Sequence, residues 1–339
     1  MMNLKRGINL GGYLSQCDYS KEHLASFIHK EDLDRIAEMG FDHVRVPVDY
    51  NILETEDGTP IESGYELLDQ VTDWCRENKL NMILDMHKVY GYDFNDAGTM
   101  ENSLFKSPAL MDRFLALWRR LAKRYGNKDF MAFELLNEIV EEDVAEAWND
   151  LIIRAVREIR QYAPTTPIIY GGIQWNSAKT VRFLRKPEDE NIIFTFHFYE
   201  PLLFTHQKAY WVAAMDPNKE ISYPATMEYY RENSRVLGYQ GNVAVNAHAG
   251  EMGPKFMEEL IADAVDAAKK AGVSLYCGEF GVIDRAPVMD TLRWFKDVNE
   301  VFRKYDIGFS VWTYKEKDFG ITGEHYKPIL QELLNIWNR

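Results

Sequence analysis

Two glutamates stand where apolar, strand-like runs end and loops begin. Glu138 closes the run 133–138, and Glu279 lies within the run 275–281. Two carboxyl groups at the ends of two strands can cleave a glycosidic bond. One donates a proton to the leaving oxygen, while the other attacks the anomeric carbon or activates water. Their separation decides the stereochemistry, because about 5–5.5 Å is typical of retaining enzymes and about 6.5–9.5 Å of inverting ones.

Several other strand-like runs carry polar or aromatic residues at or near their C-terminal ends. Those expected near the two glutamates are Arg45, His87, Asn137, His197, Tyr199 and Trp312. Arg45 beside Glu279 would keep that carboxyl group ionised by direct attraction, and Tyr199 could donate a hydrogen bond to it. The two histidines could bond sugar hydroxyls, the asparagine could donate to a 2-hydroxyl, and the tryptophan offers a sugar ring a flat face. We therefore expect Glu279 to be the nucleophile and Glu138 the proton donor.

Three further residues are expected near these groups. Asn9 and Trp175 are candidates for substrate binding. Glu134 lies two strand periods before Glu138, so we expect its side chain to share the inward face. Because a buried carboxylate needs a partner, we interpret Glu134 as structural and paired with a basic group such as His43 or Arg45.

The chemistry requires a fold that brings residues 138 and 279 together. Strand-like runs occur at 5–10, 43–48, 81–87, 131–137, 167–171, 192–198, 274–279 and 307–312. Helix patterns with apolar spacings of three and four, as at 65–78, 108–125 and 144–162, lie between most of them. This alternation predicts an α/β fold, a (β/α)8 TIM barrel with its site at the C-terminal ends of the strands. A doubly wound open sheet is the alternative, but residues 7–12 lack the spacing of a phosphate-binding loop.

One long interval interrupts the alternation. Residues 200–253, between the sixth strand and the helix expected at 254–271, are rich in aromatic side chains. Loops of this length without a function are uncommon. We therefore predict one catalytic domain over residues 1–339, with an inserted subdomain at about 200–253 on the C-terminal face of the barrel.

Charge and composition narrow the range of partners. The chain has 53 acidic and 39 basic residues, a formal net charge of −14, which argues against nucleic acid and anionic membranes as partners. It has three cysteines without metal-ligand spacing and no apolar run of the ~20 residues that a membrane helix needs. We expect no cofactor and a monomer. The location, secreted or cytoplasmic, stays open, because a leader peptide could have been removed.

The chain resembles glycoside hydrolase family 5, in particular its clostridial-type endoglucanases. The resemblance rests on segments that follow one another in the family's order, namely 7–12 (GINLGG), 43–47 (HVRVP), 84–87 (LDMH), 136–138 (LNE), 196–199 (FHFY), 278–281 (GEFG) and 311–312 (VW). It implies a retaining mechanism on a TIM barrel, with Glu138 as acid/base and Glu279 as nucleophile. It also implies an inserted subdomain after the sixth strand, from which Trp211 and His206 would reach over the cleft.

The resemblance favours an endo-acting β-1,4-glucanase that cleaves cellulose-like or mixed-linkage β-glucans. A mannanase or an exo-acting cellodextrinase on the same scaffold is the main alternative. A metal-dependent barrel hydrolase using Asp85, His87, His197 and a carboxylate is a remote one, since the His-x-His that usually follows the first strand is replaced by Asn9 and Gly11. A non-catalytic sugar-binding barrel would be expected to lack one glutamate, and both are present.

Overall fold

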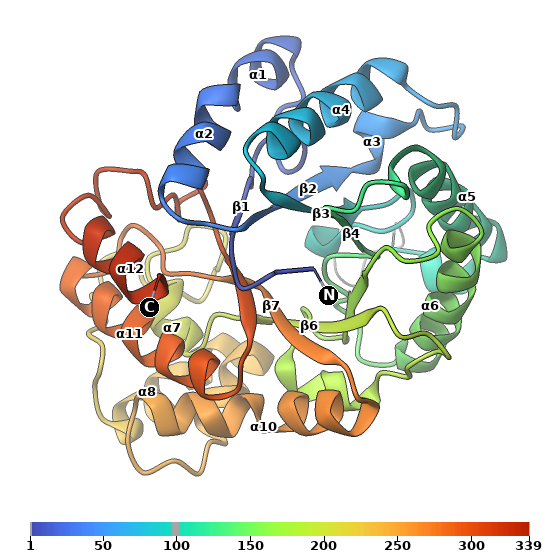
Figure 1. The fold of residues 1–339 in the computed structure, drawn as a ribbon. Coiled ribbons are helices and arrows are strands. Elements are labelled where there is room, and N and C mark those ends of the chain that lie inside the picture. The colour runs from blue at the N-terminus through green and yellow to red at the C-terminus, as the bar shows by residue number, and fades with distance from the viewer. Residues whose placement is uncertain (1, 97–101, 339) are drawn as a thin grey trace.

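A closed barrel of eight parallel strands forms the centre of the molecule (Figure 1). The computed structural model describes residues 2–96 and 102–338. The strands pair in sequence order and are β1 (Arg6–Asn9), β2 (His43–Asp49), β3 (Asn81–Lys88), β4 (Met131–Glu134), β5 (Ile168–Gly171), β6 (Ile192–Phe198), β7 (Ser274–Phe280) and β8 (Gly308–Val311). The predicted (β/α)8 barrel is thereby confirmed, and the open sheet is excluded because β8 pairs with β1.

Helices surround the barrel (Figure 1). The α-helices are α1 (Lys21–Ser26), α2 (Lys30–Glu38), α3 (Tyr50–Leu53), α4 (Glu62–Glu77), α5 (Pro108–Tyr125), α6 (Ala145–Arg160), α7 (Leu202–Thr205), α8 (Met227–Asn233), α9 (Asn242–Val245), α10 (Pro254–Ala271), α11 (Val288–Lys304) and α12 (Leu330–Trp337). The 3-10 helices are η1 (Phe94–Asp96), η2 (Leu104–Lys106), η3 (Ala178–Phe183) and η4 (Ser234–Gly241). Helix α5 starts where the sequence predicts, because Pro108 occupies its first turn and Ser107 accepts a hydrogen bond from Leu110 N.

The inside of the barrel is built in layers. Ile83, Ala132, Ile169 and Tyr276 belong to a small apolar cluster that is separate from the main core. Side chains two residues apart on a strand point to the same face, so Asp85 of β3 follows Ile83 into the barrel. Glu134 of β4 follows Ala132 in the same way, and both acids are fully buried. The polar layer that carries the site therefore rests on an apolar floor.

Strand β4 ends earlier than the sequence predicts. It stops at Glu134, whereas the apolar run indicated a strand as far as Asn137. Beyond this point the backbone still forms hydrogen bonds with the adjacent strands. Leu135 N donates to Ile169 O of β5, and Asn137 N donates to Met86 O of β3. Glu138 consequently stands on a loop whose backbone is anchored to the strands beside it.

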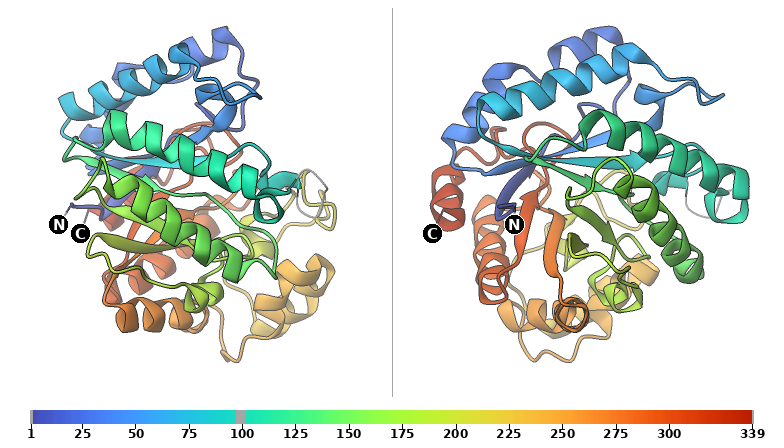
Figure 2. Two further views of the ribbon diagram at one scale, coloured as in Figure 1. Left: turned by 90° about the vertical axis from the view of Figure 1, so that its right-hand side faces the viewer. Right: turned by 45° about the vertical axis from the view of Figure 1, so that its right-hand side comes forward.

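Segment 200–253 lies at one end of the barrel and contains α7, α8, η4 and α9. In the left view of Figure 2, the two termini lie at the opposite end. The loops at the C-terminal ends of the strands and this segment thus gather on one face.

Among the described residues, none of the helices combines the length and apolar character needed to span a bilayer.

Candidate active site

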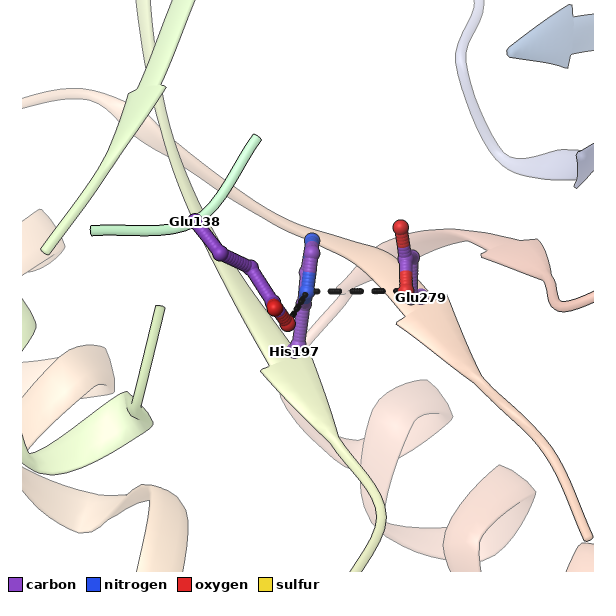
Figure 3. A group of neighbouring side chains, drawn as sticks. All are labelled: Glu138, His197 and Glu279. Atoms are coloured by element: carbon purple, nitrogen blue, oxygen red, sulfur yellow. Dashed lines mark hydrogen bonds and ion pairs between the residues drawn. The ribbon is translucent and has the colours of Figure 1, made fainter. Parts of the chain in front are cut away.

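Glu138 and Glu279 meet across His197 (Figure 3). His197 Nδ1 lies 2.8 Å from Glu138 Oε1 and 3.7 Å from Glu279 Oε2. One oxygen of each glutamate and a ring nitrogen of His197 all lie within 4.8 Å of one another. An approach of one oxygen from each group to within 4.8 Å is closer to the roughly 5–5.5 Å between the carboxyl groups of retaining glycosidases than to the roughly 6.5–9.5 Å of inverting ones.

Burial prepares Glu138 to carry a proton near neutral pH. Removal from water raises the pKa of its carboxyl group to about 7, although the positive charge of Arg45 acts in the opposite direction. Burial also lowers the pKa of His197 to about 4, so the imidazole beside Glu138 is neutral at that pH. Glu138 is therefore suited to act as a general acid and then as a general base.

Glu279 is surrounded by hydrogen-bond donors. Arg45 Nη1 donates to Oε1 at 2.7 Å, and Tyr199 Oη donates to Oε2 at 3.0 Å. Burial and the charge of Glu279 raise the pKa of Tyr199 well above its usual value, so the phenol keeps the proton that it donates. Both donors stabilise a negative charge on Glu279, which is the state that a nucleophilic carboxylate needs. The structure thus brings the three residues together as predicted.

Arg45 links most of the polar layer through one fully buried guanidinium group. It binds Glu134 with two hydrogen bonds, from Nε at 2.8 Å and from Nη2 at 2.9 Å. Its Nη2 lies 3.0 Å from Asp85 Oδ2 and donates to Asn137 Oδ1 at 2.8 Å. Of the two predicted partners for Glu134, Arg45 is therefore the one that the structure shows. Burial raises the pKa of Asp85 to about 7, which reduces the excess of negative charge around the arginine.

Asn9 and His87 do not occupy the positions expected of substrate contacts. Asn9 Nδ2 donates to Gly278 O at 3.0 Å, and its Oδ1 accepts from Arg45 at 3.0 Å. His87 Nδ1 lies 2.7 Å from Asp85 Oδ2, and its Nε2 lies 3.1 Å from Gln16 Nε2. Because these polar atoms already have protein partners, we interpret both side chains as groups that hold their neighbours in the site in position.

A cavity of about 880 Å³ opens above the two glutamates. The predicted site residues that line it are Glu138, Trp175, His197, Tyr199, His206, Trp211, Glu279 and Trp312. Trp211 and His206 come from segment 200–253, and Phe319, in the loop after β8, contacts both rings at 6.4 and 5.2 Å between centroids. The cavity therefore runs between this segment and the barrel loops, with a volume in the range of ligand sites.

Several lining residues were not predicted from the sequence. They are Gln16, Phe94, Glu200, Tyr239 and Lys317 among others. All five lie in segments that follow strands, so the rule that barrel sites are built from these loops could have indicated the regions. It could not select the residues, because no motif or periodicity distinguishes them from neighbouring loop positions.

The metal-dependent alternative is not matched by the grouping of side chains. It required Asp85, His87 and His197 with a carboxylate. In the described part of the chain, the acidic and histidine side chains close enough to share one ion are instead Glu138, His197 and Glu279. The potential ligands are thus the same groups that the glycosidase interpretation uses.

Comparisons with known proteins agree with this geometry. Residues 6–318 match the sequence model of the family described as cellulase (glycosyl hydrolase family 5). Endoglucanase C of Acetivibrio thermocellus is 40% identical over 347 residues, which cover 100% of this chain and 99% of that protein. Cellodextrinase A of Ruminococcus flavefaciens is 41% identical over 303 residues, which cover 89% and 83% of the two chains.

Solved structures with the same architecture superpose on nearly all of this chain. A protein described as a glycoside hydrolase superposes with a TM-score of 0.80 and 25% identity, over 98% of this chain and 99% of that one. The cellulose synthase subunit Z of Clostridioides difficile superposes with a TM-score of 0.76 and 26% identity, again over 98% and 99%.

Proposed function

Because the chain belongs to the cellulase family, glycosyl hydrolase family 5, we propose that it is a retaining endo-β-1,4-glucanase that cleaves internal bonds of cellulose-like or mixed-linkage β-glucans. The observation that carries the proposal is the approach of the carboxylates of Glu138 and Glu279 to within 4.8 Å. The endoglucanase at 40% identity supports the choice of substrate.

The reaction follows from the two protonation states. Glu279, held by Arg45 and Tyr199, attacks the anomeric carbon while Glu138 gives its proton to the leaving oxygen, and a glycosyl-enzyme ester forms. Glu138, now ionised, takes a proton from a water molecule. The water oxygen attacks the anomeric carbon and breaks the ester bond to Glu279. Glu279 is thereby released and Glu138 is protonated again, so each turnover restores both groups.

Segment 200–253 acts in this proposal as a substrate-binding subdomain over the cleft. Trp211 and His206 contribute to the cavity wall, and Trp175 packs against Tyr239 of η4 with 6.1 Å between ring centroids. Aromatic faces of this kind bind sugar rings by stacking. The substrate partner in this proposal is a neutral glucan chain.

Exo action is the second candidate, since a relative at 41% identity is named a cellodextrinase. The two modes differ in their products. An endo enzyme lowers the viscosity of a soluble glucan early and releases a range of oligosaccharides, and we expect this result. Release of terminal units alone would overturn the endo assignment, and a preference for mannan would favour a mannanase.

Retained activity after exhaustive chelation would eliminate the metal-dependent alternative.

The residue roles have a direct test. Glu279→Gln should abolish turnover and leave binding of cello-oligosaccharides intact, because it removes the nucleophile and little volume. Glu138→Ala should form the glycosyl-enzyme only from substrates with activated leaving groups, and azide should restore its breakdown as a glycosyl azide of retained configuration. Glu142→Gln is the matched control, since Glu142 is exposed on the loop that carries Glu138. Wild-type rates on natural glucan for Glu138→Ala would contradict the assignment.

A further inference from the structure

We propose that Gln16 is a specificity-determining residue that accepts a hydrogen bond from a hydroxyl group of a glucosyl unit on the glycone side of the cleaved bond. The proposal rests on the glucanase function proposed above and goes beyond the two glutamates and their supporting groups. Gln16 lies in the loop that follows β1, and it lines the cavity together with Trp312 and Lys317.

The backbone of Gln16 is held from two sides. Its N–H donates to Asp49 Oδ2 at 3.1 Å, and Lys317 Nζ donates to its carbonyl oxygen at 2.5 Å. The same Asp49 carboxylate accepts hydrogen bonds from Ser15 Oγ at 2.7 Å and from Tyr19 Oη at 2.5 Å. Gln16 has a φ of 53°, a left-handed conformation that a non-glycine residue keeps only where its surroundings enforce it.

A chain of contacts from the core orients the side chain of Gln16. Asp85 Oδ2 faces Arg45 Nη2 at 3.0 Å, so this oxygen stays an acceptor, and it lies 2.7 Å from His87 Nδ1. His87 is neutral, because burial lowers its pKa to about 4, and its proton is therefore on Nδ1. Nε2 is then an acceptor, and it receives a hydrogen bond from Gln16 Nε2 at 3.1 Å.

This polarity determines what Gln16 offers to a ligand. Since its amide nitrogen is directed at His87, the carbonyl oxygen Oε1 is the end left to meet a group in the cavity. A carbonyl oxygen accepts a hydrogen bond from a hydroxyl group and cannot donate one. The expected ligand group is therefore a sugar hydroxyl acting as donor.

The position of Gln16 relative to the two glutamates identifies the side of the cleft. The backbone N–H of Trp175 donates to the carbonyl of Ile139, the residue after the proton donor, so Trp175 belongs to the leaving-group side. Gln16 instead contacts His87, whose ring stacks on Trp312 with 5.9 Å between centroids and 5° between planes. Trp312 follows β8, which adjoins β7 and its nucleophile, and Gln16 follows β1 on the other side of β8, whereas Glu138 and Trp175 follow β4 and β5.

Hydrolysis of aryl β-cellobiosides tests the proposal, because both glucosyl units then occupy the glycone side. We would compare the parent compound with analogues that lack one hydroxyl at a time. Gln16→Met, which keeps the length of the side chain, should lower kcat/KM on the parent compound about 3- to 10-fold, as expected for one net hydrogen bond. One deoxy analogue should cost the wild type a similar factor and should be cleaved equally by the wild type and the variant.

Two further variants control for folding. Gln16→Asn keeps the amide and tolerates a left-handed φ, but it is too short for the contact, so it should show the same loss. Gln331→Met, on the exposed face of α12, should behave as the wild type. The role of Gln16 would be overturned if removal of each hydroxyl lowered kcat/KM by the same factor in the wild type and in the Gln16 variants. Failure of the wild type to cleave the parent compound would instead overturn the glucanase function.

Discussion

Replacing Glu138 with glutamine should stabilise the protein at alkaline pH and leave it nearly unchanged at acid pH. Burial raises the pKa of this carboxyl group from 4.5 to about 7 in the folded protein. Between these two pH values the folded protein keeps a proton that the unfolded chain has lost. The free energy of unfolding of the wild type therefore falls as pH rises through this window, and the neutral glutamine removes that dependence.

The magnitude follows from the two pKa values. Their difference corresponds to roughly 3 kcal/mol in the free energy of unfolding, at about 1.4 kcal/mol for each pH unit. For a chain of 339 residues this is an increase in Tm of about 4 °C at pH 8 for Glu138→Gln over the wild type. Paired thermal melts followed by circular dichroism at pH 4.5, 6 and 8 would measure it.

The comparison must be made between variant and wild type at each pH. Burial also raises the pKa values of Asp85 and Glu200 to about 7, and these groups titrate in both proteins. Glu142→Gln, on the same loop and exposed, controls for the substitution itself. An equal Tm difference at pH 4.5 and pH 8, or none at pH 8, would refute the argument that burial protonates Glu138.

Three other outcomes follow from the site. The value of kcat/KM should fall about tenfold per pH unit above pH 7, because Glu138 must be protonated to act as an acid, and a rate profile that stays flat to pH 9 would contradict this. Tyr199→Phe should lower kcat about 10-fold with an unchanged Tm, since it removes one donor to Glu279, as steady-state kinetics and melting would show. Arg45→Leu should lower the free energy of unfolding by about 3–5 kcal/mol in urea titrations, because buried carboxylates lose their cation, and a smaller loss than that of an exposed arginine variant would argue against the network.

The sequence was sufficient for the parts of the fold that follow from periodicity. All eight strands were predicted because each reads as a short apolar run, and helices α5 and α10 have the predicted ends. Arg45 and Glu279 were placed together correctly since both follow from strand order and alternation. The end of β4 was predicted incorrectly, because an apolar run does not show where strand pairing stops.

The limits of the sequence are clearest at residues whose position depends on distant contacts. Gln16 is held by Asp49 and Lys317, 33 and 301 residues away, and no local pattern carries that information. The side chain of Asn9 was expected to meet substrate, but its partners Gly278 and Arg45 come from other strands. Loop conformation and side-chain partnership therefore had to come from the structure.

The guanidinium of Arg45 also bears on how the barrel comes apart. From β2 it reaches groups on β1, on β3, on and just after β4, and on β7, so it joins segments from both halves of the chain. Removal of β3, β4 or β7 would leave buried charge without its partner, at a cost of several kcal/mol. The half-barrels should consequently unfold in a single cooperative transition, in which loss of catalysis and loss of tryptophan packing coincide. A single side chain would then make the integrity of the fold a condition for activity.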